Sequence, residues 1–262
     1  MTTALLILAV VFTALMMFGV PVSFSIGIAT LLALFTVTPT PNTALIVSAQ
    51  RVASSLDSFT LVAIPLFILA GGLMNTGGIA MRLIDLAKVL VGWLPGSLAQ
   101  ISVVANALFG AISGSAVASA ASVGATLSPL QRQAGYNMPI CAAANVASSP
   151  CGLLIPPSGA LIVYSLISGG TPVDVLFVAG YIPGILMAGS VMVWLAIIAR
   201  RGDLPTDVRR YSMNEAAHIF WRALPALAMI VIIMGGIVGG IFTATEAAGV
   251  AALYTLVLGL LY

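Results

Sequence analysis

The tract Gly110-Ala-Ile-Ser-Gly-Ser-Ala-Val-Ala-Ser-Ala-Ala-Ser122 consists mostly of glycine, serine and alanine, and it carries no charge. It lies inside a chain that is otherwise strongly apolar. A bilayer tolerates a broken helix only where the freed N–H and C=O groups are buried in protein or line a water-filled cavity. We therefore expect this tract to be a break in a helix that holds an ion or an anion at mid-membrane depth.

A second tract of this kind reads Ala147-Ser-Ser-Pro-Cys-Gly-Leu-Leu-Ile-Pro-Pro-Ser158. Its adjacent prolines interrupt a helix, because proline lacks the backbone N–H and clashes with the preceding turn. For either tract alone, close packing of helices through small residues is the alternative explanation. Two broken tracts in one chain favour a binding site over packing.

The composition predicts an all-α integral membrane protein. Of the 262 residues, 61% are hydrophobic and 6% are charged, whereas soluble domains carry roughly a quarter charged residues. Long apolar runs favour helices over a β-barrel, so we expect a multi-span bundle with a re-entrant helical hairpin and a broken helix. The net charge of +2 gives no indication of a nucleic-acid partner. Cys141 and Cys151 match no spacing of a transition-metal site.

The interruptions of the apolar runs divide the chain into five parts. Residues 1–76 hold membrane spans and an amphipathic helix at 43–57. Within them, Gly19-Val-Pro21 interrupts residues 5–35, which form either one tilted helix or two short ones. An interfacial arm is predicted at 77–96. The remaining parts are 97–200, with a hairpin at 97–125, a broken helix at 138–169 and a span at 173–199, then a loop at 201–221 and two helices at 222–262.

The cationic residues predict the orientation in the membrane. Five of the nine Lys and Arg residues surround one loop, at 200–222: Arg200, Arg201, Arg209, Arg210 and Arg222. The positive-inside rule places this loop in the cytoplasm. If 97–125 is re-entrant, eight of the nine cationic residues lie on the cytoplasmic side. If 97–125 were a single span, Arg82 and Lys88 would move outside.

Four motifs resemble the large membrane subunit of TRAP transporters (tripartite ATP-independent periplasmic transporters), and their order and spacing match along the whole chain. They are Ser58-Phe-Thr-Leu-Val-Ala-Ile-Pro-Leu-Phe-Ile-Leu-Ala-Gly71, Ser113-Gly-Ser-Ala-Val-Ala118, Ile155-Pro-Pro-Ser158 and Phe242-Thr-Ala-Thr-Glu-Ala-Ala248. The family's subunit is longer and has two inverted repeats. This chain looks like the first repeat followed by the first two helices of the second, at 222–262.

The resemblance implies an elevator-type fold, similar to the ion-transporter superfamily, in which 97–200 is the mobile transport part. It implies sodium-coupled import of carboxylate-bearing organic anions through the bacterial inner membrane, without enzyme activity and without an organic cofactor. The partners that it implies are a small four-helix membrane subunit, a periplasmic solute-binding protein, the organic anion and membrane lipid. Na+ would be the coupling ion.

By this resemblance, the hairpin tip and the second break form one sodium site beside the substrate. Helix breaks supply carbonyl and hydroxyl oxygens for a cation, and half-helix N-termini attract a carboxylate. The candidate sodium ligands are Ser113, Gly114, Ser115, Ser148, Ser149 and Gly152, and the candidate substrate contacts are Ser115, Asn145, Pro156, Pro157 and Ser158. Asn145 has an alternative role, which is to cap or cross-link the break.

Other readings of the sequence stay open. Within transporters, the chain could belong to a sodium/organic-anion symporter that needs no binding protein. From another class, it could be a non-transporting scaffold subunit of the membrane, whose small residues only pack helices. A passive anion channel is a third alternative. A serine hydrolase is not expected, because Ser113 and Ser115 have no His or Lys base nearby in the sequence.

Overall fold

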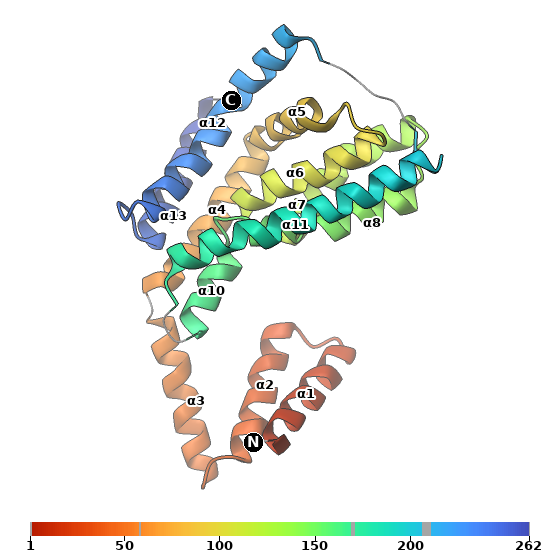
Figure 1. The fold of residues 1–262 in the computed structure, drawn as a ribbon. Helices are drawn as coiled ribbons and strands as arrows, with labels where there is room; N and C mark the ends of the chain where they lie inside the picture. The colour runs from red at the N-terminus through yellow and green to blue at the C-terminus, as the bar shows by residue number, and fades with distance from the viewer. Residues whose placement is uncertain (1, 58, 169–170, 206–210, 262) are drawn as a thin grey trace. The chain divides into compact units, whose positions relative to one another are not determined.

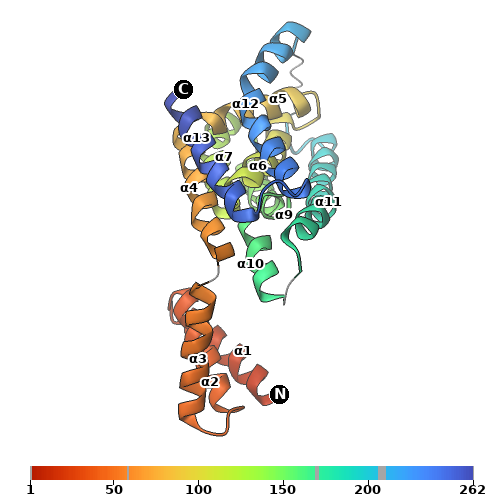
Figure 2. The same ribbon diagram turned by 90° about the vertical axis from the view of Figure 1, so that its left-hand side faces the viewer.

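The computed structural model describes residues 2–57, 59–168, 171–205 and 211–261 (Figure 1 and Figure 2). Within these residues the elements are helices joined by turns and short extended segments, without a strand, so the prediction of an all-α protein is confirmed. The chain divides into two compact units, Met1–Ser58 and Phe59–Tyr262. Parts of the sequence predictions lie outside the described residues, namely those on Ser58, Gly169, Arg209 and Arg210.

The first unit contains α1 (Thr2–Met17), α2 (Val22–Phe35) and α3 (Pro41–Leu56). Residues 5–35 thus form two short helices, the second of the two predicted alternatives. Gly19 between them has a φ of 78°, in the left-handed region that favours glycine. The helix α3 coincides with the predicted amphipathic helix, and the Thr40 hydroxyl caps it by accepting the N–H of Thr43 at 3.3 Å.

The second unit runs from a short 3-10 turn at Phe59–Val62 to α13. Its helices are α4 (Ala63–Thr76), α5 (Ile79–Val91), α6 (Ser97–Ser113), α7 (Ala116–Gln133), α8 (Met138–Ser148), α9 (Cys151–Leu154), α10 (Gly159–Ile167), α11 (Val173–Arg200), α12 (Met213–Val238) and α13 (Ala244–Leu261). Among the described residues, α11, α12 and α13 are each long and apolar enough to cross a membrane. The pair Met138–Leu154 and Gly159–Ile167, bent by 54°, passes the same test as one span.

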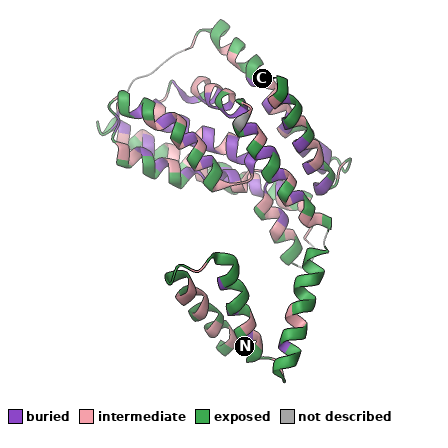
Figure 3. Cartoon of the chain, turned by 180° about the vertical axis from the view of Figure 1, so that it is seen from behind, coloured by how far each residue is buried: buried purple, intermediate pink, exposed green. Residues whose placement is uncertain are grey.

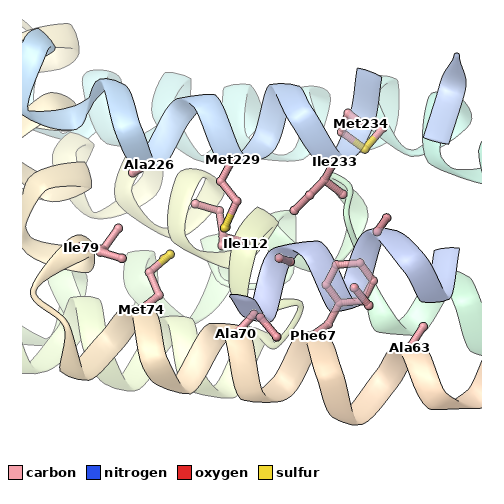
Figure 4. Packing of buried hydrophobic residues seen from close by; sticks show 14 of the residues in the cluster. Ala63, Phe67, Ala70, Met74, Ile79, Ile112, Ala226, Met229, Ile233 and Met234 are labelled. Atoms are coloured by element: carbon pink, nitrogen blue, oxygen red, sulfur yellow. The ribbon is translucent and has the colours of Figure 1, made fainter. Parts of the chain in front are cut away.

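The largest apolar cluster of the second unit joins α4, α12 and α13. Met229 and Ile233 point from α12 toward α4 (Figure 4). Phe67 and Met74 point back from α4. The outward faces of the helices carry exposed residues (Figure 3), many of them large and apolar, which suits a protein whose solvent is lipid. In lipid, close packing is what holds helices together.

The helices α6 and α7 form the predicted hairpin, and its second arm is longer than expected. The arm continues past Ala125 to Gln133. At its end the Gln131 amide donates to the Leu98 carbonyl at 3.1 Å and to the Ser102 hydroxyl at 3.0 Å. These bonds pair the end of α7 with the start of α6, so the two arms are antiparallel. That the hairpin re-enters the membrane stays a prediction.

The helix α12 begins at Met213, before the predicted boundary at residue 222. A capping box explains the early start. The Ser212 hydroxyl accepts the N–H of Glu215 at 3.3 Å, and the Glu215 carboxylate accepts the N–H of Ser212 at 2.9 Å. The polar lead-in and the apolar span are therefore one helix.

Candidate functional site

The hairpin tip is a tight turn of three residues. Gly114 ends α6 with a φ of 61°, a left-handed conformation in which a glycine is favoured at helix ends. Its N–H donates to the Gly110 carbonyl at 2.8 Å. Ser115 then caps α7, because its hydroxyl accepts the N–H of Ala118 at 3.2 Å. The sequence Ser113-Gly-Ser115 thus reverses the chain and starts a new helix at the same point.

The second break is present where the prolines predict it. The helix α8 ends at Ser148, α9 is a single turn, and an extended segment leads through Pro156 and Pro157 to Ser158. Ser158 precedes α10 but its side chain does not cap that helix. Its hydroxyl is fully buried and has no hydrogen-bond partner among the described residues. Leaving such a group unsatisfied costs about 1–3 kcal/mol, so a bound ligand or water fits this position.

The C-terminal end of this break, at residues 156–159, is called the far end and lies against the hairpin tip. A Cβ atom built on Gly114 would lie 3.3 Å from the backbone nitrogen of Gly159. Both residues border a pocket with a volume of about 510 Å³. The N-terminal ends of α7 and α10 meet at this pocket, and each offers the positive end of a helix dipole. Such ends attract anions through backbone N–H groups.

The wall opposite the tip comes from α4, which sequence reasoning treated as an ordinary span. The pocket is lined by residues of α4, α6, α7, α9, α10 and the tip: Ile64, Phe67, Ile68, Gly71, Gly72, Asn75, Phe109, Ser113, Gly114, Ser115, Ala118, Leu153, Gly159, Ala160 and Val163. None of these lining residues is charged. A Cβ atom built on Gly71 would lie 2.9 Å from the Cα atom of Ser113. The Gly71-Gly72 pair is the sequence signal that could have indicated this close approach.

The near end of the break, at residues 145–152, forms a different structure. It is a polar cluster of the buried side chains of Asn106, Ser119 and Ser148 with the half-buried side chain of Asn145. The Asn106 amide nitrogen lies 2.9 Å from the Asn145 side-chain oxygen and 2.8 Å from the Ser148 hydroxyl. The Ser119 hydroxyl donates to the Asn106 side-chain oxygen at 2.8 Å. The Asn145 amide donates to the Ala120 carbonyl at 2.8 Å. These side chains cross-link the hairpin to the broken helix, which was the alternative role foreseen for Asn145.

The remaining candidate residues also lie away from the pocket. Gly152 packs on the hairpin, since a Cβ atom built on Gly110 would lie 2.5 Å from the Gly152 Cα atom. The Ser149 hydroxyl donates to the Val146 carbonyl of its own helix at 3.0 Å. The predicted site residues therefore fall into two groups. The tip meets Pro157 and Ser158 at the far end of the break, whereas Asn145, Ser148, Ser149 and Gly152 lie at the near end. The roles of all these residues as ligands stay predictions.

Comparison with known proteins shows which family the chain matches. The family model described as "Tripartite ATP-independent periplasmic transporter, DctM component" matches residues 9–262. "Uncharacterized protein YgiK" of Salmonella typhimurium is 52% identical over 96% of this chain and 57% of its own length. "Sialic acid TRAP transporter large permease protein SiaM" of Vibrio cholerae is 39% identical over 92% of this chain and 55% of its own length.

A third relative, "C4-dicarboxylate TRAP transporter large permease protein DctM" of Pseudomonas aeruginosa, is 42% identical over 79% of this chain and 48% of its own length. The chain spans about half the length of these curated relatives. Two of the three are named as transporter permeases and none as an enzyme. With its long apolar helices, the chain is a multi-pass membrane protein that belongs to the DctM family of large TRAP transporter permeases.

Proposed function

We propose that this chain is part of a large permease that imports a carboxylate-bearing organic anion together with sodium. The observation that carries the proposal is the convergence of two helix N-termini at one pocket without charged lining residues, with the unpartnered Ser158 hydroxyl directly before one of these helices. Three relatives are named for sialic acid, for C4-dicarboxylates and for 2,3-diketo-L-gulonate, which all bear carboxylates. Helix N-termini bind such anions without a cationic side chain.

In this proposal, sodium is held by oxygen atoms of the tip and of the far end of the break. Ser113 and Ser115 line the pocket, Ser158 directly precedes the lining residue Gly159, and the Pro157 carbonyl oxygen lies 3.9 Å from where a Cβ atom of Gly114 would be. Hydroxyl and carbonyl oxygens are the ligands that broken helices offer to Na+. Bound sodium would supply the positive charge that holds the carboxylate beside it.

The residues of the near end would then support the site without coordinating the ion. Asn145 and Ser148 have their polar atoms engaged in the cluster, and Gly152 is buried against Gly110. Pro156 lies in the bend that precedes the pocket, and its peptide bond to Pro157 is cis. The proposed sodium ligands are therefore Ser113, Ser115 and Ser158 with their neighbouring carbonyl groups.

Transport would proceed by a rigid-body movement of residues 97–200 against a scaffold, linked by the arm 77–96. The surface between α6 and α4 suits such a movement. Phe109 and Ile112 of α6 pack in the same apolar cluster as α4, and the tip contacts α4 through the small residue Gly71. Apolar, small contacts present few polar bonds that must break when one body slides past the other. The bond from the Ser122 hydroxyl of α7 to the Asn75 side-chain oxygen of α4, at 2.8 Å, is one that would have to break.

The whole permease would work in the bacterial inner membrane with the loop 200–222 in the cytoplasm. Its partners would be a small four-helix membrane subunit, a periplasmic solute-binding protein and the surrounding lipid. The family supports the two protein partners, and the clustering of Arg residues around the loop supports the orientation.

Reconstituted uptake tests the proposal. The whole permease, with its small subunit, is placed in proteoliposomes, and uptake of sialic acid and of C4-dicarboxylates is measured with a binding protein for each and with an inward sodium gradient. We expect uptake that requires both sodium and the binding protein. Uptake without a binding protein would indicate an independent symporter, and flux that ignores the sodium gradient would indicate a channel. The absence of flux for every acid would favour a scaffold.

A further inference from the structure

One face of α6 and the hairpin tip follow the break from Ser148 to Gly159. Asn106 meets Ser148 and Gly110 meets Gly152 at the near end, and Gly114 meets Gly159 at the far end. Residues four apart lie on the same face of a helix, about 6 Å apart along its axis. The spacing between the two ends of the break is therefore set by α6.

Asn106 is the polar member of this series, and all of its side-chain polar atoms are used. The side chain is fully buried. Its amide nitrogen lies within hydrogen-bonding distance of three acceptors: the Asn145 side-chain oxygen, the Asn145 carbonyl and the Ser148 hydroxyl. Its side-chain oxygen accepts from Ser119. An asparagine side chain is suited to this, because it has two N–H donors and one acceptor oxygen.

The surrounding glycines make room for this junction. A Cβ atom built on Gly124 would lie 2.8 Å from the Asn145 amide nitrogen. A Cβ atom built on Gly152 would lie 3.0 Å from the Asn106 carbonyl oxygen. Both arms of the hairpin and the helices on both sides of the near end of the break thus meet at one tightly packed cluster. Its side-chain polar groups are hydrogen-bonded. Such networks are rigid, because each polar group would be left unsatisfied if the elements separated.

We propose that Asn106 is a positioning residue for the sodium site, although it does not line the pocket. It lies two helical turns, about 10 Å, before Ser113. By fixing the start of the break against α6, it sets the position of Ser158 relative to the hairpin tip. This inference rests on the proposed function, since it assumes that the tip and Ser158 hold the ion.

A matched pair of variants tests the inference. Asn106→Leu removes the bonds from Asn106 to Asn145 and Ser148 and leaves the Asn145–Ala120 bond in place. Gln131→Leu is the control, since Gln131 is also a buried amide that cross-links α6 and α7, but at the base of the hairpin. Both variants should lower the melting temperature of the whole permease. Only Asn106→Leu should also raise the half-saturating sodium concentration of uptake, by about tenfold, as loss of residues that orient metal ligands typically does.

The measurements separate this inference from the proposed function. Wild-type uptake that ignores sodium would overturn the proposed function. Sodium-dependent wild-type uptake, with an unchanged half-saturating sodium concentration in Asn106→Leu or an equal rise in Gln131→Leu, would overturn the positioning role alone. If Asn106→Leu does not fold, Ser119→Ala removes only the donor to the Asn106 oxygen. It should raise the same sodium concentration by a few-fold, and an unchanged value would again overturn the role.

Discussion

The two ends of the helix break use the same residue types in opposite ways. At the near end, the polar groups of Asn106, Asn145 and Ser148 bond to one another and hold helices together. At the far end, the Ser158 hydroxyl is just as buried but has no partner among the described residues. Burial of a polar residue at a break therefore does not by itself make it a candidate ligand, because its polar atoms can be engaged by other residues of the protein, as at the near end.

The largest effect is expected from a variant that forces the helix break away from the hairpin. In Gly110→Leu, the new side chain would collide with the backbone of Gly152, since even a Cβ atom would lie 2.5 Å from its Cα atom. Overpacking of this kind costs about 3 kcal/mol. We expect a large fall in the melting temperature and loss of uptake. A melting temperature of Gly110→Leu equal to that of the wild type would show that the contact between α6 and α9 is not tight.

Ser158→Ala tests whether the unpaired hydroxyl at the far end holds sodium. It removes a hydroxyl that has no hydrogen-bond partner among the described residues, so stability should stay at the wild-type value or rise slightly. If Ser158 holds the ion, the half-saturating sodium concentration should rise about tenfold, or about 1.4 kcal/mol. Ser190→Ala, at an exposed serine of α11, is the control for the loss of a hydroxyl. Lower stability with unchanged sodium dependence would contradict this reading of Ser158.

Gly114→Ala tests the turn at the hairpin tip, which lies against the far end of the break. Gly114 has a φ of 61°, where an L-residue costs about 1 kcal/mol. The melting temperature should fall modestly, and uptake should weaken because the tip shifts against Gly159. Gly135→Ala is the matched control, since Gly135 has a φ of 73° and open space around it. It should lower stability by a similar amount without changing uptake.

Lys88→Met gives the smallest expected effect, because it lies outside both ends of the break. The Lys88 ammonium group pairs with the Asp85 carboxylate at 2.8 Å, and both side chains are partly exposed. Such pairs contribute less than about 1 kcal/mol. Sodium dependence and stability should both stay near wild type. A marked change in uptake would mean that the arm takes part in the coupling.

The sequence alone predicted the features that depend on neighbouring residues. Pro156-Pro157 and Ser113-Gly-Ser115 located both breaks, because proline and glycine act on the local backbone. The early start of α12 was missed, since a loop was predicted at 201–221, although Ser212 followed three residues later by Glu215 is the signature of a capping box. These features need no knowledge of which helices touch.

The division of the candidate residues between the two ends of the break could not be predicted, because it depends on contacts between distant segments. Asn106 and Ser148 are 42 residues apart in the chain, and Asn145 and Ser158 read alike as polar residues beside a break. Only the packing of α6 on the broken helix shows that one is paired and the other is not. The α4 wall of the pocket was missed for the same reason.

The uncharged wall of the pocket has a consequence for how uptake responds to acidity. Backbone dipoles do not titrate, and none of the described residues that line the pocket carries an ionisable side chain. Over the range in which the solute keeps its negative charge, the affinity of this wall should be constant as the medium acidifies. A decline in uptake at low pH would then report the protonation of the solute, and its midpoint would follow the solute's own acid constant from one substrate to the next.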